Sequence, residues 1–190
     1  MRKITIILAL FCIITFAQQK GSFTDSRDGK KYKTVEIGEQ VWMAENLNFN
    51  AKGSKCYDNK PANCKKYGRL YKWQIARNAC PKGWHLPSNA DWDKFYRFAN
   101  GALHITTDGY LEVEPSWTDG YDKFDFAALL LGGCGSSDGS FNSAGNWGFW
   151  WSATEYGASA YPLLVGYDGE YADWVIYDKN DLFSIRCVKR

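Results

Sequence analysis

The chain has few of the residues from which most active sites and membrane anchors are built. It contains two histidines, two methionines and five prolines among 190 residues. Its longest apolar run, Ile4 to Phe16, is shorter than the ~20 residues that a membrane-spanning helix needs. No set of cysteines and histidines has the spacing of a zinc site. We therefore expect no transmembrane segment after removal of the leader, and little scope for histidine or zinc catalysis.

The apolar run has the features of a secretory leader. Two basic residues precede it, and Ala17 closes it with a small residue at the cleavage position. We expect residues 1–17 to be a signal peptide and the mature protein to be secreted, extracellular or at the cell surface. Cys12 follows Phe11, whereas lipidated cysteines normally follow a small residue. The sequence leaves open whether the protein is anchored.

Acidic and basic residues balance almost completely. The chain has 23 Lys and Arg against 21 Asp and Glu, and removal of the leader takes away Arg2 and Lys3, which leaves 21 against 21. A near-neutral chain disfavours electrostatic binding to nucleic acid or to an anionic membrane. Aromatic residues make up 17% and argue against disorder. About 170 mature residues suit one domain with its own core.

The first third of the mature chain contains a hairpin and a small cysteine loop. Residues 18–30 are polar and are expected to form a flexible lead-in to a domain over 31–190. Residues 31–43 alternate apolar and polar side chains on both sides of a Gly-containing turn, which predicts a β-hairpin. Cys56 and Cys64 enclose a turn-rich stretch and are expected to form a disulfide in an oxidising compartment.

Two helices are predicted next. The first has an apolar stripe at steps of three and four residues, formed by Leu70, Trp73, Ala76 and Cys80. The second begins at Ser88, whose side chain with Asp91 forms a capping box. It continues with apolar residues at helical spacing and ends at Asn100-Gly101.

The second half of the chain predicts short strands between irregular loops. The loops cover residues 101–123 and 135–148, and the strands cover residues 150–154, 161–167, 171–177 and 182–188. An Asp-Gly turn joins the two middle strands into a hairpin. Alternation in the last strand directs Cys187 into the same core as Cys80. We therefore expect a disulfide between Cys80 and Cys187 that clamps the domain end to end.

Five segments have the character of family motifs: Tyr32–Leu47, Tyr67–Trp73, Cys80–Ser88, Trp151–Glu155 and Ser184–Val188. In this order they resemble the Fibrobacter succinogenes major paralogous domain family. The resemblance covers residues 28–190, nearly all of the mature chain. It implies a secreted or surface protein.

A more distant resemblance implies a fold. A helix, Cys80, Gly83, a capped helix with Trp92 and a closing Cys187 are similar to C-type-lectin-like domains. The segment 83–92 is also similar to the formylglycine-generating enzymes, which share that broad architecture. The resemblance implies an α+β fold with two helices packed on antiparallel strands, a disulfide staple, and long irregular loops that carry any ligand site.

The calcium site of sugar-binding lectins has no clear counterpart. Glu114-Pro115-Ser116 lacks the third ligand of the lectin motif. Asp119, Asp122 and Asp125 recur at every third residue, which does not fit the spacing of an EF-hand loop, and a solvated acidic loop is the simpler interpretation. We expect no cofactor, and calcium is left open without a motif to support it.

Catalytic candidates are few. His85 precedes the capped helix, where a structural hydrogen bond is expected, and no nucleophile pairs with His104. The formylglycine-generating group uses two active cysteines near its C-terminal end, and only Cys187 lies there. We therefore predict that the protein is not an enzyme. Cys134 remains as an odd thiol, either a half-buried free cysteine or an intermolecular partner, and the oligomeric state is open.

Four aromatic residues in or beside the loops are the candidate ligand-binding residues: Trp117, Trp147, Trp150 and Tyr156. Exposed aromatic faces stack on sugar rings and anchor protein interfaces, and burial in the core is the competing interpretation for each ring. We predict a secreted or cell-surface, non-catalytic binding or adhesion module that recognises a glycan or a protein through its loop face. The alternatives are a structural envelope or matrix component and a cryptic enzyme on a formylglycine-generating-like scaffold.

Overall fold

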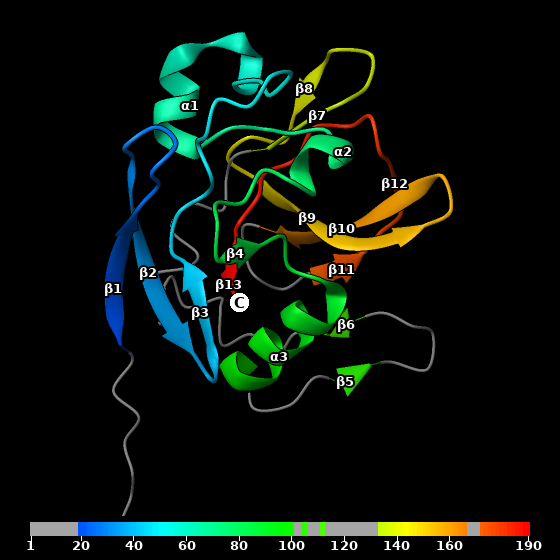
Figure 1. Cartoon of the computed structure of the whole chain (residues 1–190). Coiled ribbons are helices and arrows are strands. Elements are labelled where there is room, and N and C mark those ends of the chain that lie inside the picture. Colours follow the sequence, from blue (N-terminus) through cyan, green and yellow to red (C-terminus); the bar gives the residue numbers. More distant parts are fainter. Residues whose placement is uncertain (1–18, 101–103, 106–110, 113–132, 167–171) are drawn as a thin grey trace, which may run out of the picture.

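A computed structural model describes residues 19–100, 104–105, 111–112, 133–166 and 172–190 (Figure 1). Several expectations fall on residues outside these ranges: the leader 1–17, the Glu114-Pro115-Ser116 segment, Asp119, Asp122, Asp125, Trp117 and the turn at 168–170. The described part is α+β, with antiparallel strand pairs and three short-to-medium helices. Among the described helices, none has the length and apolarity that crossing a bilayer requires.

A five-stranded sheet contains both ends of the described chain. Its order is β1 (Lys20–Thr24), β2 (Lys31–Ile37), β3 (Gln40–Met43), β13 (Val188–Lys189) and β4 (Trp84–His85). The hairpin predicted over 31–43 is confirmed as β2 and β3, which pair Thr34 with Met43 and Ile37 with Gln40. The lead-in expected to be flexible instead forms the edge strand β1 along β2. Its side chains are exposed except for the half-buried Phe23, and this single apolar residue gave no alternation from which a strand could be predicted.

The two faces of β2 bury different residues. Tyr32 packs into one core cluster, while Val35 and Ile37 pack into another with Trp92 of α3 (Asn89–Asn100). Because side chains alternate along a strand, Lys31 lies on the same face as Val35 and Ile37 but beyond the helix, and it stays exposed. Along this face of β2, the first half is basic and exposed, and the second half is apolar and buried.

The second sheet is formed by the C-terminal half of the chain. The long strands β9 (Trp147–Tyr156) and β10 (Ser159–Gly166) pair with each other, and β10 also pairs with β11 (Ala172–Trp174) and β12 (Tyr177–Asp178). The predicted hairpin is confirmed by the pairing of Leu163 with Trp174. Two small pairs complete the strands: β5 (His104–Ile105) with β6 (Leu111–Glu112), and β7 (Cys134–Gly135) with β8 (Phe141–Asn142).

The helices differ in how well their sequence signals predicted them. The capping box of α3 is confirmed, because the Asp91 amide donates to Ser88 Oγ (3.2 Å) and the Ser88 amide donates to Asp91 Oδ2 (2.9 Å). The apolar stripe at 70–80 gives only one turn, α2 (Trp73–Ala76). Leu70 and Tyr71 are extended instead, since they form bridges with Lys55 and Phe183. The helix α1 (Pro61–Tyr67) follows the 3₁₀ turn η1 (Tyr57–Asn59) and was not predicted.

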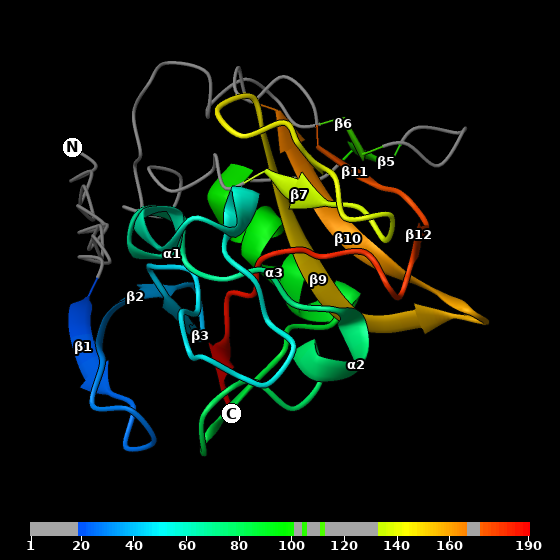
Figure 2. The same cartoon turned by 90° about the horizontal axis from the view of Figure 1, so that it is seen from above.

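The C-terminal segment runs through the centre of the molecule. Figure 1 shows it in red between the two sheets, and the perpendicular view of Figure 2 agrees. Residues 182–188 are all buried. The strand predicted over this range is limited to β13, because the preceding residues bond in turn to different neighbours: Leu182 to Gly135, Phe183 to Tyr71, and the Ile185 carbonyl to the Leu47 amide. The segment is therefore buried on both faces and is held by isolated bridges, not by the continuous strand pairing that was expected.

Both expected disulfides are confirmed. Cys80 and Cys187 are joined with Cα atoms 5.9 Å apart, and Cys56 and Cys64 with Cα atoms 4.8 Å apart. The first bridge spans 107 positions and the second spans 8. The long bridge fixes the central C-terminal segment to the loop before β4, and the short bridge fixes the start of η1 to α1.

The two bridges should differ in their effect on stability. In the loop-entropy relation, the long bridge contributes about 5 kcal/mol to the free energy of unfolding and the short one about 2.5 kcal/mol. The double variant Cys80→Ser/Cys187→Ser should therefore lose more stability in urea titration than its matched control Cys56→Ser/Cys64→Ser. Equal losses, or a larger loss in the control, would contradict this ranking.

Candidate functional site

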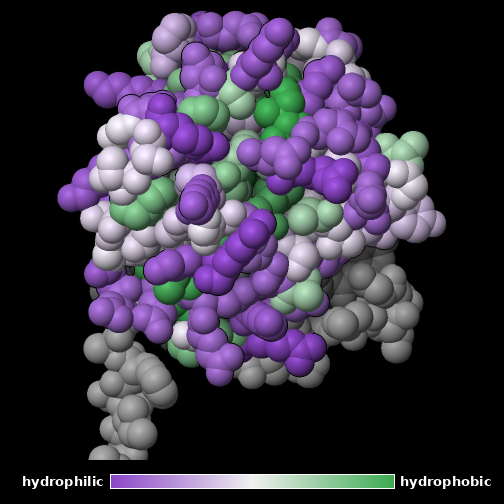
Figure 3. All heavy atoms as spheres, viewed as in Figure 1, coloured by the Kyte–Doolittle hydropathy of each residue, from purple (hydrophilic) through white to green (hydrophobic). Residues whose placement is uncertain are grey.

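A groove of about 570 Å³ lies between the β1–β2 strands, residues 44–48 and the C-terminal end of α1. Its volume is in the range of small-ligand sites, which measure roughly 300–1,000 Å³. Six lysines line it, opposed by one acid, Glu45: Lys20, Lys30, Lys31, Lys33, Lys65 and Lys66. We call this feature the lysine groove. Figure 3 shows hydrophilic side chains over most of the face of the molecule that is seen in Figure 1.

The sheet supplies one side of the lysine groove. Lys31 and Lys33 are two residues apart on β2, so they share a face and lie about 7 Å apart along the strand. Lys20 begins β1 and pairs with Val35, which places it at the other end of the same strand pair. The edge strand β1 thus extends the basic surface, and its exposed lysine also disfavours edge-to-edge pairing.

Helix α1 supplies the other side. Lys65 and Lys66 occupy its last turn, where positive charge complements the helix dipole. The helix ends at Gly68 with φ of +79°, and a Cβ there would lie 2.8 Å from Asn46 Cβ and 3.0 Å from the Leu47 carbonyl oxygen. The absence of a side chain therefore lets the end of α1 contact residues 46–47 closely.

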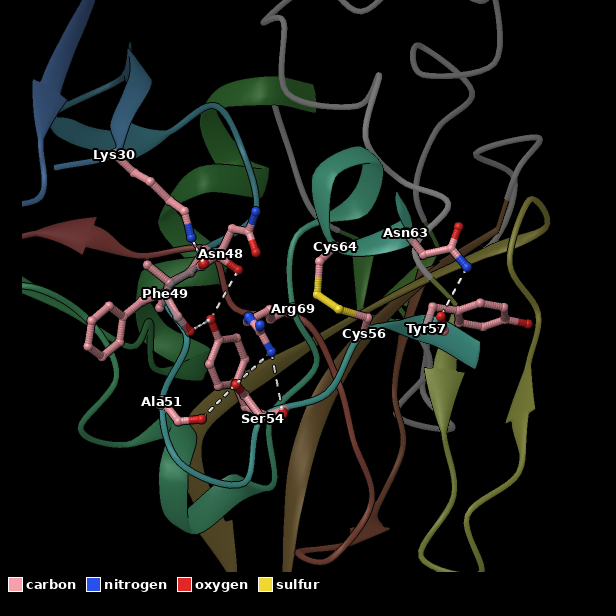
Figure 4. Close-up of a disulfide and its surroundings, with 12 residues drawn as sticks. Lys30, Asn48, Phe49, Ala51, Ser54, Cys56, Tyr57, Asn63, Cys64 and Arg69 are labelled. Atoms are coloured by element: carbon pink, nitrogen blue, oxygen red, sulfur yellow. Dashed lines mark hydrogen bonds between the residues drawn. A yellow bond between two sulfur atoms is a disulfide. The ribbon is translucent and has the colours of Figure 1, made fainter. Parts of the chain in front are cut away.

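The side chain of Lys30 is held in place by a hydrogen bond and an ion pair. Its ammonium donates to the carbonyl oxygen of Asn48 and lies 3.3 Å from Asp28 Oδ2. Figure 4 shows this side chain pointing at residue 48, close to the loop held by the Cys56–Cys64 bridge. The other basic residues differ: within the described residues, no carboxylate lies within 4 Å of the ammonium groups of Lys31, Lys33, Lys65 and Lys66. Their positive charge is available to a ligand.

The floor of the groove is tied to the core through Asn46. Its Oδ1 accepts hydrogen bonds from Trp150 Nε1 (2.8 Å) and from Arg186 Nε (3.2 Å) and Nη2 (2.9 Å), while its Nδ2 donates to the Tyr67 carbonyl oxygen (2.9 Å). Arg186 is completely buried, with its guanidinium 5.5 Å from the centre of the Trp150 ring. We call these three side chains the Asn46 cluster. It joins the groove, β9 and the C-terminal segment.

The three predicted aromatic site residues that the structure describes do not form a common ligand surface. Trp150 is 1% exposed and belongs to the core, so its assignment as a ligand contact is corrected by the structure. Trp147 is half-buried and packs against the larger core cluster. Tyr156 is 60% exposed, and its ring centre lies 6.0 Å from that of the half-buried Tyr161 on the adjoining strand. Trp117 lies outside the described residues.

The lysine groove was missed in the sequence because its members are spread over residues 20–66. The alternate Lys31 and Lys33 and the adjacent Lys65 and Lys66 are the available signals. Each of these pairs is also typical of a solvated strand or helix face. Only the placement of α1 across the groove from β2 distinguishes a shared basic groove from two separate surfaces.

His85 makes the structural hydrogen bond that was expected of it. Its Nε2 lies 3.3 Å from Asp91 Oδ2, the same oxygen that accepts from Ser88 Oγ at 2.7 Å. Burial alone would raise the pKa of Asp91, but the hydrogen bonds from Ser88 and the adjacent His85 lower it overall. The carboxylate stands between the hydroxyl and the imidazole, so this trio forms a helix cap and does not activate Ser88 as a nucleophile. Across the described ranges, no three His, Cys, Asp or Glu side chains group closely enough to hold a metal ion.

Cys134 is a free cysteine in the β7 strand. It is 9% exposed, its Sγ lies 3.8 Å from the Asn142 carbonyl oxygen, and burial raises the pKa of its thiol to about 11. A buried, protonated thiol is a poor nucleophile. These properties favour the free structural cysteine over the intermolecular partner.

Removal of the Asn46 side chain should destabilise the fold strongly. Asn46→Ala leaves the Trp150 indole and the buried Arg186 guanidinium without their shared acceptor, at a cost of about 3 kcal/mol in the free energy of unfolding. Asn48→Ala is the matched control, since the hydrogen bonds of Asn48 use its backbone amide and carbonyl. Urea titration of both variants checks the difference, and similar values for the two would refute the role of the Asn46 cluster.

The Cys134 thiol should be unreactive in the folded protein. A pKa of about 11 lowers its thiolate fraction about 100-fold relative to an ordinary cysteine, so a disulfide reagent at about pH 8 should label it far more slowly than in urea. Cys134→Ser should remove the signal. Fast native labelling, or a disulfide-linked dimer that this variant abolishes, would show an exposed thiol instead.

The motifs gathered in this fold match one known domain. The family model of the Fibrobacter succinogenes major domain (Fib_succ_major) matches residues 35–189. No curated protein and no solved structure matches the chain. The matched range contains Lys65 and Lys66 of α1, the Asn46 cluster and the Cys80–Cys187 bridge, and the other four lysines of the groove precede it. The chain therefore belongs to the Fibrobacter succinogenes major domain family.

Proposed function

We propose that this protein is an extracellular, non-catalytic binding module whose ligand lies in the lysine groove. The observation that carries the proposal is the gathering of six lysines and one acid around a single concave site in a chain whose mature net charge is zero. A cleft lined by charges of one sign concentrates ligands of the opposite sign. The site thus has the electrostatics of a binding surface.

The scaffold around the groove supports binding rather than chemistry. The Asn46 cluster holds its floor, and the Cys56–Cys64 bridge holds the helix that forms one side. A fixed site loses little conformational entropy when a ligand binds. In the described residues the His85 trio is a cap and Cys134 is buried and protonated, so neither supplies an acid, a base or a nucleophile to the groove.

The expected fold and location fit this proposal. We propose a C-type-lectin-like arrangement, supported by helix α3, which packs against strands β2 and β9, and by the Cys80–Cys187 bridge that spans the domain. Two disulfides favour an oxidising, extracellular compartment. A glycan is the preferred ligand of such a module, and Tyr156 beside Tyr161 is a second surface on which a sugar could stack. A structural envelope component and a cryptic enzyme remain the alternatives.

A glycan array with the mature chain tests the proposal. Lys31→Glu/Lys33→Glu should weaken binding by about tenfold or more, because it replaces two attractive charges in the groove with repulsive ones. The matched control is Lys82→Glu/Lys189→Glu, which makes the same change in net charge at two exposed lysines outside the groove. Absence of binding to every glycan, or equal weakening by both variants, would reject the groove as the site of a binding module.

A further inference from the structure

The lysine groove also specifies the chemistry of its ligand. We infer that the ligand is an acidic polysaccharide, bound as an extended chain whose repeated carboxylate or sulfate groups pair with the lysines on both sides of the groove. This inference rests on the proposed function and adds the ligand class to it.

The number and distribution of the charges favour a polyanion over a single small anion. Lysines lie on β1, on β2 and on α1, so they come from two opposite sides of the groove. One small anion reaches only a few of them, and a single exposed ion pair contributes little to affinity. A chain with a charge on many of its units contacts several lysines at once, and the weak contacts then act together.

The choice of lysine over arginine fits the same ligand. No arginine lines the groove among the described residues. Arginine provides a planar fork for bidentate recognition of one phosphate or carboxylate, whereas a lysine ammonium is a point charge that accepts many geometries. A flexible polymer with varying charge positions is matched by adaptable point charges.

The aromatic residues of the groove disfavour single-stranded nucleic acid. Such ligands stack their bases on exposed aromatic rings. Tyr32 is buried, and its hydroxyl accepts from the Asn48 amide. The Lys66 ammonium lies 4.7 Å from the centre of the Tyr67 ring and covers it. The Tyr32 ring is therefore closed to a base, and Lys66 occupies one face of the Tyr67 ring, so the groove offers little aromatic surface beside its charge.

The shape and polarity of the groove favour an acidic sugar polymer over an anionic membrane or an acidic peptide. A flat anionic membrane reaches the rim of a concave site, not its floor. Beside the lysines, the lining of the groove includes the uncharged polar residues Thr34 and Asn48 together with the acid Glu45. Sugar hydroxyls can both donate to a carboxylate such as that of Glu45 and accept from an ammonium or amide, whereas the ionised side chains of an acidic peptide can only accept. A sugar polymer with acidic groups therefore matches both features.

Calorimetry with polygalacturonate, and with the same polymer after full methyl esterification, tests the inference. The mature protein should bind the acidic form, and esterification should weaken binding by about tenfold or more because it removes the charges. Raising the salt from about 0.05 M to about 0.5 M should weaken binding to the acidic form similarly. Sulfated dextran and unmodified dextran provide a second charged and neutral pair.

Variants on each side of the groove show where the polymer binds. Lys31→Glu/Lys33→Glu and Lys65→Glu/Lys66→Glu should each weaken binding by about tenfold, while Lys82→Glu/Lys189→Glu should change it less than about twofold. Thermal unfolding of each variant confirms that it is folded.

The outcomes distinguish the inference from the proposed function. Groove-dependent binding of neutral and acidic polymers with equal affinity would overturn the ligand class and leave the binding function standing. Polyglutamate or single-stranded DNA binding as tightly as the best acidic polysaccharide would overturn it in favour of an acidic peptide or a nucleic acid. Absence of binding to any of these polymers and to the glycan array would reject both.

Discussion

The carboxamide of Asn46 links three segments that are far apart in the sequence. Its oxygen accepts from Trp150 of β9 and from Arg186 of the C-terminal segment, and its nitrogen donates to the last residue of α1. A buried guanidinium is tolerated only where its donors are satisfied. The position of Asn46 is therefore set by the core, and the same residue lines the lysine groove. The groove and the core are therefore joined through the side chain of Asn46.

Local signals in the sequence predicted the elements that depend on local interactions. The β2–β3 hairpin and the capping box of α3 were identified because alternation, turn glycine and cap residues act within a few positions. The two disulfides were predicted from the expected secretory leader and from the placement of the cysteines. None of these needed knowledge of which distant segments meet.

The errors come from interactions between distant segments. Trp150 was expected among the ligand-binding rings because it neighbours a polar loop, yet its indole nitrogen has a partner 104 positions away. The stripe from Leu70 to Cys80 has helical spacing, but backbone bridges to Lys55 and Phe183 hold its first residues extended. The alternation at 182–188 predicted two different faces, although both are buried between two sheets. The spacing of apolar residues predicts which side chains share a face, but it does not identify the distant segment that packs against that face.

The lysine groove illustrates the same limit for charge. The net charge of zero expected after removal of the leader argued against electrostatic binding to nucleic acid or an anionic membrane, and that argument assumes an even distribution of charge over the surface. The fold instead places lysines from β1, β2 and α1 around one site. Like charges repel, so this gathering costs stability, and the cost is kept small by water above the exposed ammonium groups and by the paired Lys30. The rigid scaffold beneath, with one bridge beside α1 and the Asn46 cluster under the floor, is what holds the two basic sides in register against that repulsion. A ligand of opposite charge would relieve the repulsion as it binds, which is the physical reason for proposing this groove as the binding site.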